Sequence, residues 1–260
     1  MTETPDDNRS TLSRRKALTL LGMAGVVLVP ACQSGGSDTG SASAPTSAGS
    51  SPPTSAGSTA APTTVPPGSI ACVLTPEFTE GPFYLDLDDV RSDITEGRPG
   101  APLELKITVV DADGCTPIKD AAVDIWHADA GGVYSGFERA QGETFLRGTQ
   151  ISGGDGLVTF RTVYPGWYRG RAVHIHTKVH VSGAEVHTGQ LFFDDGFTDT
   201  VYAAAPYNAR PGRDVRNTGD GIFRRANADS AVLDVRSQAG ANVAEIIVGV
   251  RPGAGRPNQA

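Results

Sequence analysis

Hydrophobic and polar residues alternate repeatedly along the chain after about residue 70. In one stretch Leu103, Leu105, Ile107 and Val109 are apolar, and the residues between them are polar. A period of two sends alternate side chains to opposite faces, so this pattern predicts a half-buried β-strand. Similar patterns predict strands over Ala121–Trp126, Leu157–Val163, Val173–Val181, Thr188–Phe193 and Asn242–Val250.

Turn signals rich in glycine separate these strands, as at Asp113–Gly114 and at Gly153–Gly156. The pattern predicts one short helix, around Thr198–Ala205, which ends before Pro206. Strands do not alternate with helices, which disfavours a parallel α/β sheet. We therefore predict an all-β fold, an antiparallel β-sandwich with short helical insertions.

The N-terminal residues follow a different pattern. Arg14 and Arg15 precede an uncharged run from Ala17 to Ala31, and Cys32 follows it. The run is shorter than the roughly 20 residues that span a bilayer, and it matches the apolar region of a signal peptide. Residues 1–32 are predicted to be a twin-arginine-type signal peptide with a lipobox-like end, where Cys32 would carry a lipid. The alternative is a plain membrane anchor.

Residues 33–69 are all Ser, Thr, Pro, Gly or Ala, apart from Gln33, Asp38 and Val65. Such a segment has too little apolar surface to offset the entropy lost on ordering. It is predicted to be a disordered linker that holds a domain away from a membrane or wall. We expect an exported protein, either extracellular or lipid-anchored at the outer face of the cell membrane.

The remaining residues, 70–260, are predicted to form one domain with a sizeable core. The chain has 22 Lys and Arg against 29 Asp and Glu, a formal net charge of −7, and no basic block. This charge argues against a nucleic-acid partner. Of the 3 cysteines, Cys72 and Cys115 lie in the predicted domain. An oxidising compartment favours a disulfide between them, and two buried free thiols are the alternative.

His174 and His176 carry the first chemical signal. They project from one face of a predicted strand, with Ile175 on the opposite, apolar face. Their backbones are about 7 Å apart, so both imidazoles could converge on one metal ion. A pair of half-exposed surface histidines is the alternative. His180 lies on the same face and is either a third ligand or solvated.

Two tyrosines carry the second signal. Tyr168 follows the Pro165–Gly166 turn and precedes His174 by six residues, close enough to reach the same metal. Tyr134 follows a strand that ends in glycines. Taken alone, a buried tyrosine more often packs in a core with its hydroxyl bonded to the backbone. A tyrosinate needs a strong positive charge nearby because its free pKa is about 10, and a trivalent metal supplies that charge.

Five segments, in this order, resemble motifs of the intradiol ring-cleavage dioxygenases: Thr79–Tyr84, Asp124–Ser135, Pro165–Tyr168, Arg171–His176 and Thr188–Phe193. The resemblance implies a β-sandwich with a mononuclear non-haem Fe(III) held by Tyr134, Tyr168, His174 and His176. It implies that O2 opens a catechol-type ring between the two hydroxyl-bearing carbons, which gives a cis,cis-muconate-type diacid.

The resemblance also implies roles for single residues. Tyr168 would leave the metal and accept a substrate proton, and Arg171 would stabilise charge on the substrate ring, with Arg169 as its competitor. Gln190 would line the same pocket. Membrane contact is expected only through a lipid on Cys32.

Two other function classes remain open at this stage. One is a tethered binding module on the cell surface, which would hold no iron. The other is a cupin-like metalloprotein that uses the His-x-His pair for zinc, copper or ferrous iron, although it leaves Tyr134 and Tyr168 unexplained.

Only five residues separate Tyr168 from His174, fewer than in the well-known catechol and protocatechuate enzymes, so the resemblance does not imply the size of the substrate. The roles of His127, His180 and His187 and the oligomeric state stay open.

Overall fold

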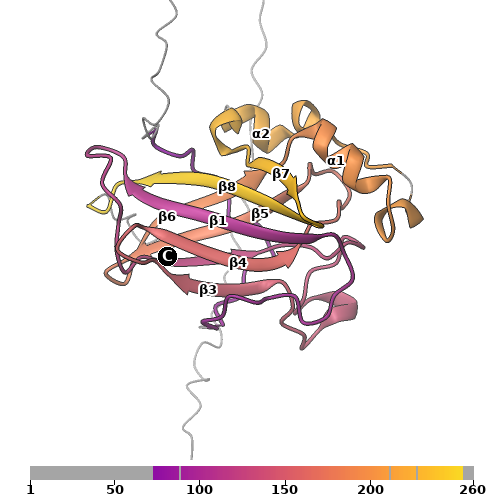
Figure 1. Ribbon diagram of the computed structural model, residues 1–260, viewed down its shortest axis with the longest axis horizontal. Helices are drawn as coiled ribbons and strands as arrows, with labels where there is room; N and C mark the ends of the chain where they lie inside the picture. The colour runs from indigo at the N-terminus through magenta and orange to yellow at the C-terminus, as the bar shows by residue number, and fades with distance from the viewer. Residues whose placement is uncertain (1–72, 88, 211, 227, 254–260) are drawn as a thin grey trace, which may run out of the picture. The chain divides into compact units, whose positions relative to one another are not determined.

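The computed structural model describes residues 73–87, 89–210, 212–226 and 228–253 (Figure 1). The predicted signal peptide, the linker, Cys32 and Cys72 lie outside these residues. Cys115 is disulfide-bonded. Its pairing with Cys72 stays a prediction. Within the described residues, no helix is both long enough and apolar enough to cross a membrane.

The described strands form two four-stranded sheets that pack into a β-sandwich (Figure 1), as predicted. The first sheet has the order β4–β1–β8–β7, formed by Leu157–Val163, Pro102–Asp111, Ala241–Val250 and Asp234–Gln238. The second has the order β3–β2–β5–β6, formed by Arg147–Ile151, Ala122–Trp126, His174–Val181 and Ala184–Phe192.

One apolar core lies between the sheets. Leu103, Leu105, Ile107 and Val109 of β1 point into it, and each is at most 1% exposed. They meet inward side chains of the second sheet: Val123, Ile125, Ile175, Val179 and Leu191. Full burial of such a side chain stabilises the fold by about 1.5–3 kcal/mol. The alternating pattern in the sequence is thus the pattern of core contacts.

The outer face of the second sheet is covered as well. The segment that precedes β1 runs across it: Phe78 donates its backbone N–H to Thr188 in β6, and the ring of Tyr84 lies 4.9 Å from that of Trp126 in β2. Consequently most of β5 is buried on both faces. A second, smaller interior therefore forms between this segment and the sheet.

One strand pair corrects the antiparallel prediction. β1 and β8 are parallel, in a register that runs from Leu103 opposite Asn242 to Asp111 opposite Val250, whereas the other paired strands are antiparallel. Most of the domain lies between β1 and β8 in sequence. Since no tight turn joins them, hairpin geometry does not set their relative direction.

Two short strands and one short helix escaped the sequence patterns. β3 carries Arg147 and Thr149, and β7 is almost wholly exposed, so neither shows the apolar alternation that predicts a strand. Helix α2 spans Gly221–Ala226. Helix α1 spans Asp195–Tyr202 and begins earlier than predicted, because the Asp194 side chain accepts the N–H of Phe197 and caps it.

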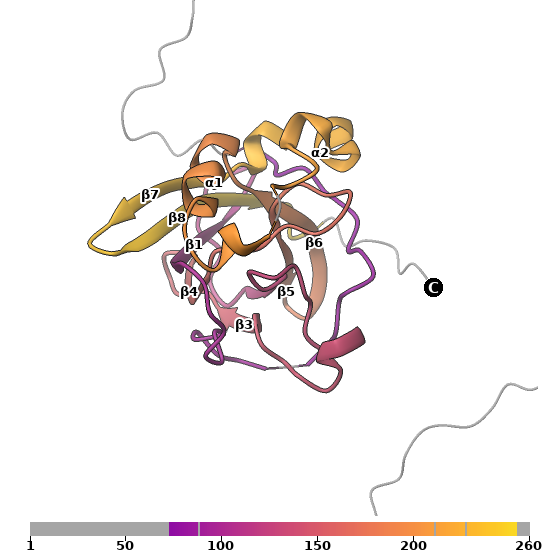
Figure 2. The same ribbon diagram turned by 90° about the vertical axis from the view of Figure 1, so that its right-hand side faces the viewer.

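The helices lie together on the side of the sandwich away from β3, as both views show (Figures 1 and 2). Short 3₁₀ turns complete the fold at Glu138–Ala140, Tyr207–Ala209, Asn217–Gly219 and Ala228–Ala231. Both α-helices thus belong to the segment that follows β6 in sequence, and they lie on one side of the sandwich.

Candidate metal centre

His174 and His176 lie side by side in the smaller interior, on the outer face of the second sheet, and are 3% and 1% exposed. Ile175 points the other way, into the main core, as the alternation predicts. His174 Nδ1 donates to the carbonyl oxygen of Ala172 at 2.7 Å, so its Nε2 carries a lone pair. That Nε2 lies 3.0 Å from Nε2 of His176.

Tyr168 is brought to the same point by the Pro165–Gly166 turn. Its hydroxyl oxygen lies 3.1 Å from Nε2 of His174. The N–H of Gly166 donates to the carbonyl oxygen of Asp129 at 3.1 Å. A Cβ atom on Gly166 would overlap the carbonyl oxygens of Asp129 and Ala130. Glycine therefore allows the Tyr168 loop to lie directly against the loop that carries Tyr134.

Asp129 shapes the Tyr134 loop. Its Oδ1 accepts the N–H groups of Gly131 and Val133, both at 2.9 Å, and its carbonyl oxygen accepts the N–H of Gly132 at 2.8 Å. Side-chain bonds of this kind hold an aspartate turn. The turn delivers the buried Tyr134 ring to 5.5 Å from the ring of Tyr168 and 6.0 Å from that of His176. All four residues named by the motifs thus come together.

Burial determines the protonation of these four groups. It lowers the pKa of His174 to about 3, with Arg171 adding to the effect, and lowers the pKa of His176 well below its usual range. Burial likewise raises the pKa of Tyr134 and of Tyr168, although Arg171 opposes the rise at Tyr168. Both imidazoles are therefore neutral, and both phenols keep their protons when no cation is present.

Two buried polar atoms in this cluster lack a hydrogen-bond partner within the described residues, the Tyr134 hydroxyl and His176 Nδ1. Leaving a buried polar atom unpaired costs about 1–3 kcal/mol, which points to a role other than stability. Neutral imidazole nitrogens and phenol oxygens are donors that suit iron. Within the described residues, no group of three or more His, Cys, Asp or Glu side chains is placed to hold a metal ion, so a metal at this cluster would need the tyrosines as ligands. The four residues could thus hold one metal ion.

Aromatic contacts hold two of these rings in place. Trp126 stacks on His176 with ring centres 4.9 Å apart and an interplanar angle of 7°. Phe83 stacks on Tyr134 at 4.3 Å and 14°. Packing of this kind limits rotation of the donor rings and keeps the cluster preorganised.

Arg171 lies behind Tyr168. Its Nη1 donates to the Tyr168 hydroxyl at 3.4 Å, and its Nη2 donates to Oε1 of Gln190 at 2.5 Å. Gln190 is fully buried and sits opposite His176 in the pairing of β5 with β6. Arg169 is exposed. The geometry thus places Arg171, rather than Arg169, beside the cluster.

Sequence reasoning missed Arg147 in β3, which is 3% exposed and supports the Tyr134 region. Its guanidinium donates to the carbonyl oxygen of Phe83 at 2.7 Å and to the side-chain and carbonyl oxygens of Ser135 at 2.8 and 2.7 Å. It thereby ties the residues beside Tyr134 to the covering segment. A lone arginine in an unrecognised strand carries no signal that could have revealed this role.

A cavity of about 370 Å³ opens beside the two tyrosines. Its described lining consists of Tyr134, Tyr168, two phenylalanines and four further residues: Phe83, Phe137, Gly132, Val133, Glu138 and Arg139. That volume is in the range of small-molecule sites. The two histidines, Arg171 and Gln190 are not part of this lining. Gln190 contacts Arg171. Its place in the substrate pocket stays a prediction.

The other histidines have different surroundings. His127 is buried and bonds through both ring nitrogens, to the carbonyl oxygen of Ala128 at 2.9 Å and to the Thr162 hydroxyl at 2.8 Å. His180 lies 3.4 Å from the carboxylate of Asp124. His187 is buried in β6. His180 is thus paired with Asp124. It is not part of the donor cluster, by which we mean the four proposed metal ligands Tyr134, Tyr168, His174 and His176.

Comparisons with known proteins agree with one another. Residues 73–212 match a family model described as Dioxygenase. A chlorocatechol 1,2-dioxygenase from Cupriavidus pinatubonensis is 30% identical over 186 residues, which are 63% of this chain and 71% of that protein. Catechol 1,2-dioxygenase 1 of Acinetobacter lwoffii is 38% identical over 101 residues, 36% of this chain and 32% of that protein.

Solved structures are similar too. An intradiol ring-cleavage dioxygenase from Tetranychus urticae superposes with a TM-score of 0.67 at 36% identity, over 70% of this chain and 96% of that one. The dioxygenase domain of a carbohydrate-binding fusion protein from Streptomyces sp. SirexAA-E gives a TM-score of 0.55 at 30% identity, over 69% and 99%.

Proposed function

Because the chain belongs to the intradiol ring-cleavage dioxygenases, a family of oxidoreductases, we propose that it opens the ring of a catechol-type substrate with O2. Cleavage falls between the two hydroxyl-bearing carbons and gives a cis,cis-muconate-type diacid. The observation that carries the proposal is the convergence of two phenols and two neutral imidazoles beside a cavity of about 370 Å³.

Tyr134, Tyr168, His174 and His176 would hold a mononuclear non-haem Fe(III). The fit rests on the lone pair of His174 Nε2, on His176 Nε2, which lies 3.0 Å from it, and on the buried Tyr134 hydroxyl. When bound, Fe(III) lowers the pKa of coordinated phenols and makes a catechol ring reactive toward O2. The high pKa values of the two tyrosines in the metal-free protein agree with this need for a strong cation.

Tyr168 would accept a proton from a substrate hydroxyl. Among the four proposed metal ligands, it is the one that both borders the cavity and forms hydrogen bonds with other polar groups. Its oxygen already lies 3.1 Å from His174 Nε2 and 3.4 Å from Arg171 Nη1. A proton acceptor has to lie within hydrogen-bond reach of the group it deprotonates. Tyr168 lines the cavity, so a substrate bound there would lie beside it.

Arg171 would stabilise negative charge on the substrate ring. Arg171 contacts Tyr168 and does not border the cavity itself. It would therefore contact the substrate only when the Tyr168 side chain moves aside. Movement of the Tyr168 side chain would then expose the guanidinium at the moment when charge develops. Donors aimed at developing charge in a dry site contribute most to such catalysis. Gln190 keeps Arg171 in place by accepting its Nη2–H.

Purified protein tests this function directly. We expect one iron per chain, a wine-red colour from tyrosinate-to-Fe(III) charge transfer, and O2 uptake with a panel of catechols, with ring-opened diacids identified as products. A folded protein that stays colourless and consumes no O2 after reconstitution with Fe(III) would contradict the proposal. Stoichiometric zinc or copper would favour the cupin-like alternative, and no metal at all the binding module.

Export remains part of the proposal. The support lies in the signal-like residues 1–32 and in the disulfide-bonded Cys115, since disulfides persist in oxidising compartments. Cell fractionation, with labelling of a lipid on Cys32, tests it. Recovery of the enzyme from the cytoplasm with its N-terminus uncleaved would overturn the export prediction without affecting the catalytic one.

A further inference from the structure

Asp220 places a buried carboxylate against Arg171 from outside the part of the chain that matches the family model, which ends at residue 212. Its side chain is fully buried. Its Oδ2 accepts the Nε–H of Arg171 and the backbone N–H of Ala172, both at 2.9 Å. Its Oδ1 accepts the N–H groups of Ile222 at 2.7 Å and Phe223 at 3.2 Å, at the start of α2.

The contact with Arg171 settles which way the guanidinium faces. A guanidinium is planar, with its five N–H groups in a fixed fork. With Nε bound to Asp220, Nη1 points to the Tyr168 hydroxyl and Nη2 to Gln190. Rotation of the side chain would break all three bonds together. The orientation of Arg171 toward Tyr168 thus depends on a carboxylate 49 residues away in sequence.

The contact with Ala172 extends the same support to the donor cluster. Ala172 gives its N–H to Asp220, and its carbonyl oxygen accepts Nδ1–H of His174. The residue that sets the tautomer of His174 is thus held by the carboxylate that orients Arg171. Partners of this kind behind a metal-ligating histidine typically change metal affinity or activity 10–100-fold when they are lost.

We infer that Asp220 is a positioning residue of the active site, which acts through Arg171 by holding its guanidinium against Tyr168 and Gln190. The inference rests on the proposed function, because it assigns Arg171 a task in the reaction. Within the described residues, Asp220 does not line the cavity, and its hydrogen bonds go to Arg171 and to backbone N–H groups and not to the four proposed metal ligands.

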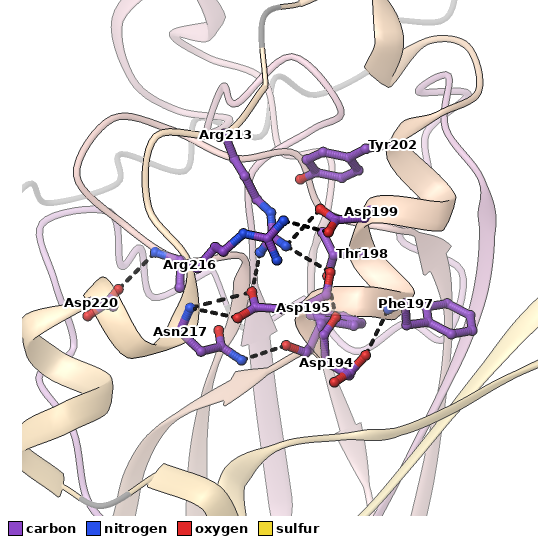
Figure 3. A network of polar contacts seen from close by, with 12 residues as sticks. Asp194, Asp195, Phe197, Thr198, Asp199, Tyr202, Arg213, Arg216, Asn217 and Asp220 are labelled. Atoms are coloured by element: carbon purple, nitrogen blue, oxygen red, sulfur yellow. Dashed lines mark hydrogen bonds and ion pairs between the residues drawn. The ribbon is translucent and has the colours of Figure 1, made fainter.

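The segment that carries Asp220 is anchored independently of it (Figure 3). Arg213 reaches between Asp195 and Asp199 of α1 and pairs with both, and Arg216 pairs with Asp199 at 2.6 Å. The Asn217 side chain donates to the carbonyl oxygen of Phe193 at 2.8 Å, at the end of β6. A change at Asp220 therefore removes the contact with Arg171 while these ties to α1 and β6 remain.

The experiment begins with Asp220→Asn in the iron-loaded, full-length protein. Asparagine has the same shape, so its Oδ1 can still cap α2, but its uncharged amide cannot replace the carboxylate beside Arg171. We expect kcat, measured per bound iron, to fall about 10–100-fold, with little change in KM. The matched control is Asp199→Asn, which breaks ion pairs of the same segment away from Arg171 and should leave kcat unchanged.

A double-mutant cycle with Arg171→Ala separates positioning from structural damage. If Asp220 acts through Arg171, adding Asp220→Asn to Arg171→Ala lowers kcat no further. A wild-type kcat in Asp220→Asn, or an equal fold-loss in both backgrounds, would overturn the inference. If Asp220→Asn does not fold, Asp220→Ser, which also caps a helix, takes its place in the cycle. If the protein without any substitution cleaves no catechol, the proposed function is wrong, and the inference about Asp220, which rests on that function, is wrong as well.

Discussion

The Nδ1–H of His174 is bonded to the carbonyl oxygen of Ala172 at 2.7 Å, two residues before it in the chain. A carbonyl oxygen can only accept, so this bond assigns the proton to Nδ1 and leaves Nε2 unprotonated. Nε2 is the atom that faces His176 and Tyr168. The backbone directly before β5 thus leaves Nε2 of His174 free to bind a metal.

His174→Ala should remove this nitrogen and weaken iron binding by at least about 100-fold, since it deletes a donor and not merely its support. Iron content and absorbance of the purified protein measure the effect. His180→Ala is the matched control, because His180 lies on the same strand but pairs with Asp124, and it should keep its iron. Stoichiometric iron in His174→Ala would show that the assignment of donors is wrong.

Tyr134→Phe should affect function much more than stability. The Tyr134 hydroxyl is buried and makes no hydrogen bond of good geometry in the described part of the chain, although the Tyr168 hydroxyl lies beside it, so its removal should change the free energy of unfolding of the metal-free protein by less than about 1 kcal/mol. The colour should weaken and ring cleavage should fall, because a donor oxygen is lost. Urea unfolding of the metal-free protein and absorbance of the iron-loaded protein measure the two effects.

Tyr164→Phe is the control for that change. Tyr164 is also buried, and its hydroxyl bonds to Thr198 at 2.8 Å and not to any of the four proposed metal ligands. Its loss should lower stability by about 1 kcal/mol and leave the colour intact. If Tyr134→Phe behaved in the same way, with full colour and activity, Tyr134 would not be a donor.

Gly166→Ala should separate the loops that carry the two tyrosines. The added methyl group would overlap the carbonyl oxygens of Asp129 and Ala130, which are backbone atoms that cannot rotate away. Overpacking of this kind costs about 1–3 kcal/mol. We expect a lower melting temperature and loss of most of the colour. Gly154→Ala, where a Cβ meets nothing within 4 Å, should change neither. Full colour in Gly166→Ala would mean that close loop contact is not needed for iron binding.

His127 should make the protein sensitive to mild acid. Burial lowers its pKa to about 4, below the roughly 6.5 of an unfolded chain, so the folded state resists protonation of this ring. Its contribution to stability is therefore complete above about pH 6.5 and is lost as the pH falls toward 4. The loss amounts to about 3 kcal/mol.

Urea unfolding at several pH values between 7.5 and 4 measures this loss. His127→Gln, which cannot be protonated, should show a shallower decline over the same range, and the difference between the two curves isolates His127 from the other buried histidines. Parallel curves would indicate that His127 stays neutral for another reason or is protonated without cost.

The strands that the sequence revealed are those with one face in the main core. Leu103 to Val109 alternate because every second side chain packs between the sheets, and the same rule placed His174 and His176 on one face with Ile175 on the other. β3 and β7 gave no such signal, since Arg147 occupies a buried position in one and solvent surrounds the other. The alternation of apolar and polar residues along a strand therefore indicates only that one face of that strand packs against an apolar core.

The sequence by itself determined the sandwich, the shared face of the two histidines and, through motif resemblance, the family. The tertiary structure alone decided what surrounds that face. It showed that β1 and β8 run parallel, that residues before β1 bury the histidines, and that Asp220 lies against Arg171. The physical reason is that these contacts join residues far apart in the chain. Their distances depend on how the whole chain packs, and no spacing within one segment encodes them.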